Sequence, residues 1–554
     1  MHLKRNLFLL AGFMVGLAIS GNCATITGTV QGAEGTPFQG AFVEARNAKT
    51  RITVIVLSGT DGRYEIENLP AGEYRLQIRA VGYRAEPRDA VTLAATQKAS
   101  YNFQLKNDTV RWTDVSLYQA KQLWPASPAK DQFFKTCSTC HGFQTRIAPF
   151  TRDVEGWRDR IEYMRRAMHF SLASFTDQQA AEMSSYFASL YGPEPVLPKS
   201  PADMPGYKDT LRPISSEALN IVYVEYPMPG PDRMPFSAAP DKDGFVWIPN
   251  FGSANKISRL DPKTGVMQDF TVPHAGTAAI HSAVPGPDGS VWLIESGANI
   301  LGQWDPRTQK ITEFQDYYLP GKEGTGEGGS KHTTRVAPDG SVWSSGAPLT
   351  KFDPETRKFT RFEDVIFTYD VKPDKNGDVW FTTFGPNARY GRDSAAQKLT
   401  PEQSPQNKIG KVDGKTMKVS QWILPTANSL PRRMEIAPDG MIWVGEYNGG
   451  NMARFDPKTQ TFKEFPLPGP DPTPYAMGFD AEGYLWYNSH RMDVLGRMDT
   501  KTGKVIEYPF PHSEIAMREF FRDAQGRMWY GSNPNNVVGY FYLAKKGKRA
   551  GSSE

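Results

Sequence analysis

The sequence predicts a multidomain, mainly β protein with an N-terminal β-sandwich, a small all-α domain and a seven-bladed β-propeller. Three observations support this. Residues 25–106 alternate apolar and polar side chains between Asp-Gly and Pro-Ala-Gly turns. Residues 110–195 have helical periodicity instead. From residue 221 onward, a Gly-x-x-Trp motif recurs seven times, with tryptophan at 247, 292, 343, 380, 443, 486 and 529.

The chain begins with a predicted export signal. Lys4 and Arg5 precede an apolar run that is too short to span a bilayer and that ends in small residues around Ala24. Cleavage after Ser20 or near Ala24 fits equally, whereas a lipid anchor on Cys23 is disfavoured because Asn22 stands where a small residue is needed. We expect a periplasmic or secreted bacterial protein that does not cross the membrane. The expected divisions are a signal peptide 1–23, a sandwich 24–107, a helical domain 108–195, a Pro-rich linker 196–220 and a propeller 221–545.

Composition excludes one class of partner. The formal net charge is +4 over 554 residues, so the chain carries no strong basic field for nucleic acid. The basic tail at 545–549 is interpreted as a solvated end.

The run Cys137-Ser138-Thr139-Cys140-His141 carries the most chemical information. Cys-x-x-Cys-His is the attachment signature of c-type haem, in which two thioethers hold the porphyrin and the histidine binds the iron. A redox or disulfide pair and half of a zinc site are the alternatives. A zinc site needs a second Cys or His pair nearby, and the sequence offers none. We therefore predict covalent haem c held by Cys137, Cys140 and His141.

The surrounding helices resemble a small c-type cytochrome domain. A helix is expected to carry the signature, 153–169 forms a second helix, and the capping box Thr176-Asp177-Gln178-Gln179 starts a third. The sixth iron ligand is expected from the middle helix. Met164 is favoured because its spacing after Trp157 resembles the cytochrome pattern, with Met168 and His169 as alternatives.

The first eighty residues of the mature chain resemble the carboxypeptidase regulatory-like domain. The resemblance rests on Gly28-x-Val30, Gly40-Ala41-x-Val43, the Thr-Asp-Gly-x-Tyr run at 60–64 and the Leu-Pro-Ala-Gly-x-Tyr run at 69–74. It implies a transthyretin-like sandwich with a structural or adhesive role.

The repeat predicts four-stranded blades of about forty residues each. The strand-like segment 221–226 precedes the first blade and is expected to complete the last one, which closes the ring and removes a free edge. The Pro-Asp-Gly-x-Val-Trp runs at 287–292 and 338–343 and the segment 380–383 resemble the streptogramin B (virginiamycin B) lyase family. That resemblance implies the fold more strongly than the reaction.

The repeat register predicts which side chains meet in the central channel. Eight residues before each repeat glycine lie Phe236, His281, His332, Tyr369, Arg432, Tyr475 and Arg518, which we call the ring. Three residues after the tryptophans lie a second set that includes Glu295 and Glu446. A pocket for an anionic or phenolic ligand is one interpretation, and a solvated channel without a ligand is the other.

The lyase resemblance implies a catalytic His pair, which falls on His281 and His332, and magnesium held by two carboxylates. The carboxylate positions are Ser330 and Gly346 here, which puts the Mg site in doubt. The sequence therefore favours an exported monohaem cytochrome that transfers electrons to or from a periplasmic redox partner, with a propeller that binds an unknown small molecule or partner. A propeller lyase, a haem-linked dehydrogenase and a non-catalytic recognition protein are the alternatives.

Overall fold

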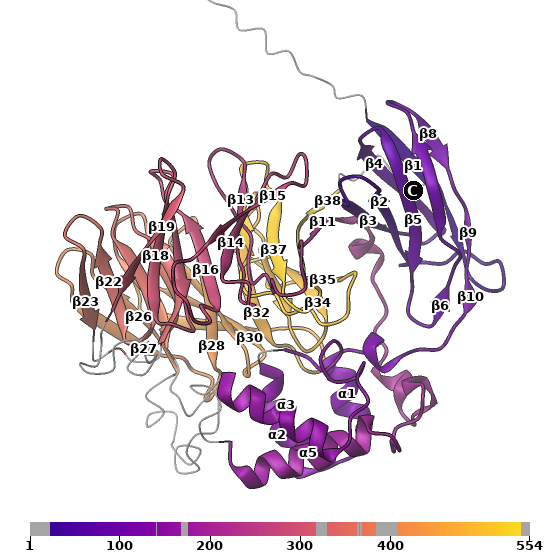
Figure 1. Cartoon of the computed structure of the whole chain (residues 1–554), viewed down its shortest axis with the longest axis horizontal. Helices are drawn as coiled ribbons and strands as arrows, with labels where there is room; N and C mark the ends of the chain where they lie inside the picture. The colour runs from indigo at the N-terminus through magenta and orange to yellow at the C-terminus, as the bar shows by residue number, and fades with distance from the viewer. Residues whose placement is uncertain are drawn as a thin grey trace, which may run out of the picture.

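The N-terminal region is a two-sheet β-sandwich in the computed structural model, which describes residues 23–139, 141–167, 175–316, 330–362, 365, 368–383 and 407–544 (Figure 1). The predicted signal segment lies outside these residues. The turn at Gly62 needs a left-handed backbone, with φ of 75°, and a Cβ there would lie 2.5 Å from the Val30 carbonyl oxygen. The strands are β1 (Ala24–Gln31), β2 (Phe42–Asn47), β3 (Thr53–Leu57), β4 (Arg63–Leu69), β5 (Gly72–Arg79), β6 (Tyr83–Arg84), β7 (Arg88–Leu93), β8 (Lys98–Ser100), β9 (Phe103–Gln104) and β10 (Lys106–Asn107).

Burial alternates along the sandwich strands as the sequence pattern predicts. Ile26, Gly28 and Val30 of β1 are buried, while the alternating Thr27 and Thr29 are partly exposed. One sheet has the order β4-β1-β8, with β9 also paired to β1, and the facing sheet contains β3-β2-β5-β7. The predicted sandwich is confirmed.

Residues 112–191 form helices around an aromatic core. The helices are α1 (Leu117–Leu123), α2 (Pro128–Lys135), α3 (Val154–Ala167) and α5 (Asp177–Tyr191). The predicted capping box is present, because Thr176 Oγ1 accepts from the Gln179 amide and Gln179 Oε1 accepts from the Thr176 amide. Trp124, Phe133 and Trp157 are among the buried side chains that hold the helices together.

The Pro-rich stretch does not run free between the domains. It forms short 3-10 helices at Pro201–Asp203, Tyr207–Thr210 and Ser216–Asn220. Tyr207 packs into the helical core, and Leu219 packs into the propeller. No helix among the residues described is long and apolar enough to cross a membrane.

The C-terminal region is a propeller of antiparallel four-stranded sheets. Each motif tryptophan lies buried on the second strand of its blade. Blades 1 to 3 are β12 (Ala239–Pro240) to β15 (Met267–Thr271), β16 (Ile280–Pro285) to β19 (Lys310–Gln315), and β20 (Ser330–Val336) to β23 (Lys358–Phe362). Blades 4 to 6 are β24 (Thr368–Pro373) to β27 (Val419–Ile423), β28 (Pro431–Ile436) to β31 (Thr461–Pro466), and β32 (Pro474–Phe479) to β35 (Val505–Pro509).

The second and third strands of each of these six blades lie between the bounds given above. They are β13 (Val246–Pro249), β14 (Lys256–Leu260), β17 (Val291–Glu295), β18 (Ile300–Asp305), β21 (Val342–Ala347), β22 (Leu349–Asp353), β25 (Val379–Thr383), β26 (Lys408–Val412), β29 (Ile442–Glu446), β30 (Asn451–Asp456), β33 (Leu485–Ser489) and β34 (Val494–Met498).

The seventh blade closes the ring with strands from both ends of the propeller sequence. It consists of β36 (Phe521–Arg522), β37 (Met528–Ser532), β38 (Val537–Leu543) and β11 (Ile221–Pro227). The pairing of β11 with β38 confirms the predicted closure. The other edge of β11 pairs with β3 of the sandwich, so both domains share one eight-stranded sheet. Figure 1 shows the sandwich beside the seventh blade, and the helices below the propeller in this view.

Candidate functional site

The predicted haem-attachment run, residues 137–141, begins with a 3-10 turn at Cys137–Thr139, shortly after α2. Cys137 begins this turn and packs against the helical core, whereas Cys140 lies outside the described residues. His141 Nδ1 is 2.7 Å from the carbonyl oxygen of Gly142, and this contact requires Nδ1 to donate. The lone pair is therefore on Nε2, which is the ligand form of a histidine whose other nitrogen is fixed by a backbone oxygen.

Burial keeps His141 neutral. Burial first, and then the positive charges of Arg146 and Arg518, lower the pKa of His141 to about 4. A neutral imidazole is the form that binds a metal, because protonation occupies the lone pair. The tautomer and the lowered pKa together make His141 fit the role of a proximal ligand.

Of the three candidates for the sixth ligand, the structure describes one. Met164 is half-buried on α3, and its spacing places it on the helix face that carries Trp157 and Ile161. That face packs into the helical core, where the rings of Trp157 and Phe187 have centroids 5.4 Å apart. Met168 and His169 lie outside the described residues.

The propeller contacts the backbone of the attachment run. Arg432 Nη1 donates to the Thr139 carbonyl at 3.1 Å, and Arg491 Nη2 donates to the Phe134 carbonyl at 3.0 Å. His490 lies between the Ser138 carbonyl, 3.1 Å from Nε2, and the Ile515 carbonyl, 3.2 Å from Nδ1. Burial and nearby arginines hold the pKa of His490 well below its ordinary value, so this neutral ring donates to one carbonyl at a time.

The predicted ring residues meet across the channel beneath this run. Ring centroids are 3.9 Å apart for His281 and His332 and 4.2 Å apart for His332 and Tyr369. The hydroxyls of Tyr369 and Tyr475 are in contact. The guanidinium of Arg518 closes the circle, at 4.8 Å from the Tyr475 ring and 5.3 Å from the Phe236 ring, and Phe236 lies 4.9 Å from His281.

Arg432 lies inside the circle of ring residues and connects it to the helical region through its hydrogen bond to the Thr139 carbonyl. Its guanidinium is 3.8 Å from the ring centroid of Tyr447 and 4.4 Å from that of Tyr475. Arg432 is fully buried, and the other ring residues are buried except half-buried His332. The side chains pack against one another at this level, so a ligand can reach them only by displacing some of them.

The lyase-like histidine pair is therefore present, but its surroundings differ from a metal site. Gly346 occupies the second position at which a carboxylate is expected. Its backbone amide donates to the Thr368 hydroxyl at 2.7 Å. Within the described ranges, no group of three or more His, Cys, Asp or Glu side chains could hold a metal ion. The side chain of Ser330 is outside what the structure describes.

Glu295 and Glu446 do not join the ring. Each ends the second strand of its blade and interacts with a glutamate on the fourth strand of the same blade, Glu313 and Glu464 respectively. Burial first, and then the neighbouring glutamate, raise the pKa of each group to about 8. Each of these carboxyl groups therefore interacts with the fourth strand of its own blade.

Glu295 makes stability depend on pH. Because its pKa in the folded protein is raised from 4.5 to about 8, its stabilising contribution is complete below about pH 4.5 and is lost as pH rises through 8. Between about pH 5 and about pH 8, we expect the unfolding free energy of the wild type to fall by about 3 kcal/mol more than that of Glu295→Gln. Urea unfolding at the two pH values measures this difference. Glu482→Gln, at a carboxylate that is 68% exposed, should follow the wild type, and equal losses in all three proteins would contradict the assignment.

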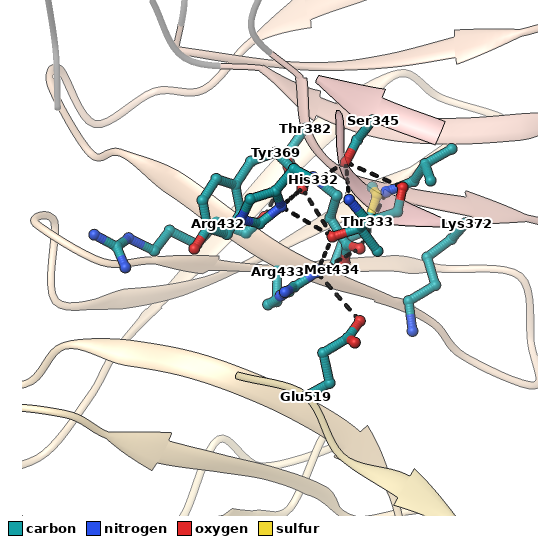
Figure 2. Close-up of polar contacts among 12 residues, drawn as sticks. His332, Thr333, Ser345, Tyr369, Lys372, Thr382, Arg432, Arg433, Met434 and Glu519 are labelled. Carbon is teal, nitrogen blue, oxygen red and sulfur yellow. Dashed lines mark hydrogen bonds and ion pairs between the residues drawn. The ribbon is translucent and has the colours of Figure 1, made fainter. Parts of the chain in front are cut away.

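A second layer of charges crosses the channel beyond the ring. Arg433 forms ion pairs with Asp370 at 3.1 Å and with Glu519 at 3.2 Å, and Arg335 also pairs with Glu519. Figure 2 shows Arg433 between Thr333 and Glu519. Burial disfavours the charged form of Glu519, but Arg335 and Arg433 outweigh it and hold its pKa below the usual range. Lys372 and Glu435 continue the layer at 2.5 Å, beside a cavity of about 10 Å³, the lower limit for one water molecule.

Comparison with known proteins supports both β regions. Residues 25–106 match the carboxypeptidase regulatory-like domain, and residues 396–548 match the virginiamycin B lyase family. A solved streptogramin B lyase is similar at 20% identity, over 60% of this chain and 100% of that one, with a TM-score of 0.50.

Two further solved structures are less similar. Virginiamycin B lyase from Staphylococcus aureus has 18% identity over 58% of this chain and 100% of that one, with a TM-score of 0.48. The extracellular domain of a putative hybrid two-component system from B. thetaiotaomicron has 13% identity over 55% and 40% of the two chains, with a TM-score of 0.40. No curated protein matches the chain. The chain thus combines a carboxypeptidase regulatory-like domain with a virginiamycin B lyase-like propeller.

Proposed function

We propose that this protein is an exported monohaem c-type cytochrome that transfers electrons, and that its propeller binds the substrate or partner. The observation that carries the proposal is His141, which follows the Cys-x-x-Cys pair and presents Nε2 in the ligand form. Cys137 and Cys140 would hold the haem c covalently, and Met164, with Met168 as alternative, would supply the sixth ligand. When bound, such a group supplies one-electron chemistry.

The chain's own residues prepare this site. The Gly142 carbonyl orients the imidazole, and burial keeps it unprotonated. The aromatic core packs against Trp157 and Ile161, which lie on the same face of α3 as Met164. The N-terminal export signal proposed for residues 1–23 is consistent with haem attachment outside the cytoplasm.

A haem-linked dehydrogenase is a second candidate, because the attachment run touches the ring. Arg432 bonds the Thr139 carbonyl and stacks on Tyr475, so a molecule that opened the ring would lie one side chain away from the haem-attachment run. Electrons removed from that molecule would leave through the haem to a periplasmic redox partner. The lyase alternative retains the His281–His332 pair but has Gly346 at a metal position.

The proposal is tested by expressing the full chain with the haem maturation machinery. We expect a reduced α-band near about 550 nm and haem that stays with the denatured polypeptide. Met164→Ala should keep the covalent haem but open the sixth position, so that the reduced protein binds carbon monoxide. Met183→Ala, at a buried methionine on α5, is the control that should not bind it. A colourless wild type with both thiols free would refute the proposal. Carbon monoxide binding by neither variant would assign the sixth ligand elsewhere.

A further inference from the structure

One carboxylate of the propeller holds the segment that follows the haem-attachment run. Glu514, in the loop before β36, accepts hydrogen bonds from the Gly142 amide at 2.8 Å and from the Thr145 amide at 2.9 Å. Its Oε2 atom also accepts from the Thr145 hydroxyl at 2.7 Å. Glu514 is 1% exposed, so these three bonds form away from bulk water.

A second carboxylate holds Glu514 itself. Asp493 Oδ2 accepts from the Glu514 amide at 3.2 Å and from Gln144 Nε2 at 3.1 Å, and Oδ1 accepts from the Ile515 amide at 2.8 Å. Asp493 occupies the position just before the third strand of its blade. At this position blades 1, 2 and 7 carry Asn255, Asn299 and Asn536 in the same left-handed conformation.

The backbone of Glu514 is strained where its side chain contacts Gly142 and Thr145. Its φ is 66°, a left-handed value that a glutamate seldom adopts. The attachment segment also approaches closely, because a Cβ on Gly142 would lie 3.0 Å from Glu514 Cγ. A buried carboxylate on a strained backbone thus accepts three hydrogen bonds from a segment 369 to 372 residues earlier, which fixes the position of that segment.

The other side of the run is held as well. Arg432 bonds the carbonyl of Thr139, and His490 contacts the carbonyl of Ser138. The backbone is thus fixed two residues before His141 by Arg432 and one residue after it by Glu514. The imidazole itself is bonded to the Gly142 carbonyl, so an anchor on Gly142 also sets the ring orientation.

We propose that Glu514 is the positioning residue of the haem-attachment run, through which the propeller fixes the plane and location of the His141 imidazole. This inference rests on the proposed function for its haem part, whereas the contact between Glu514 and the helical region stands on its own. It makes the propeller part of the haem environment, and it predicts that a change in the propeller loop alters the reduction potential.

The test uses the full-length protein and three variants. In Glu514→Gln the amide nitrogen can no longer accept from a backbone amide, and Glu514→Ala removes every acceptor. Glu295→Gln is the matched control, because Glu295 is also a buried glutamate and interacts with Glu313 within its own blade. Hydrogen exchange of the peptide that spans residues 141–147 reports the contact without haem, and potentiometric titration of the α-band reports its effect on the haem.

We expect amide exchange in that peptide to be about tenfold faster in Glu514→Gln, which removes one acceptor, and faster still in Glu514→Ala, which removes both. We expect a shifted reduction potential in both variants, and neither change in Glu295→Gln. Unchanged exchange in Glu514→Ala, or an equal change in the control, would overturn the proposal. Faster exchange with an unchanged potential would refute the positioning role. A wild type without haem refutes the proposed function, and in that case the exchange data still decide whether Glu514 holds the loop.

Discussion

Replacement of His141 by alanine is expected to yield an exported protein without stably attached haem and without the α-band near about 550 nm. The imidazole is the single described group next to the thiols whose tautomer leaves a lone pair for iron. Its removal deprives the attachment run of its proximal ligand while the aromatic core of the helices stays intact. Absorption spectra and the mass of the denatured chain measure the loss.

His274→Ala is the control for this variant. His274 is half-buried in the loop after β15, where its backbone amide bonds Glu313, and it plays no part in the attachment run. It should retain full haem content. A His141→Ala protein with the wild-type band and the wild-type mass would contradict the assignment of the proximal ligand.

The second large effect is expected from Asp370→Ala. Asp370 is fully buried and accepts from Arg433 at 3.1 Å and from the Met434 amide at 3.1 Å. Its loss leaves the buried Arg433 with Glu519 as its remaining carboxylate, which Arg335 already shares. Breaking one side of a buried ion pair costs about 3–5 kcal/mol, because the other charge stays in a poorly solvated site. Urea unfolding should show this loss in unfolding free energy.

An exposed ion pair offers the contrast. Lys351 and Asp339 lie 3.4 Å apart, with side chains 22% and 59% exposed, so Lys351→Ala should cost less than about 1 kcal/mol. Similar losses of unfolding free energy in the two variants would mean that water or a rearrangement solvates the charge of Arg433. In that case the buried charge layer does not contribute to the stability of the propeller.

The repeat register was sufficient to predict the ring, because equivalent positions in successive blades point to the same axis. The charge layer beyond it was missed for a specific reason. Strict alternation directs the residue after a ring position into the blade, but β-bulges interrupt the first strands, as between Thr368 and Val371 and between Pro431 and Met434. The bulges turn Asp370 and Arg433 into the channel beside the ring residues that precede them.

The contact between helices and propeller had no local signature. Gly142 and Glu514 are 372 residues apart, and neither belongs to a motif that indicates its partner. The partners of Glu295 and Glu446 were missed for a related reason. Their side chains interact with the fourth strands of their own blades, and the sequence did not show which of the two sides they face. Motifs thus predicted the fold and a candidate haem ligand, while tertiary packing determined which groups surround them.

The double pairing of β11 has a consequence for biosynthesis. In a ring that closes with its first and last strands, the first strand stays unpaired until all the blades between them have been translated. An unpaired strand edge can associate with other chains. Here β3 precedes β11 in the chain and bonds its second edge. The sandwich is therefore translated early enough to cover one edge of β11 before β38 is available to pair with the other edge.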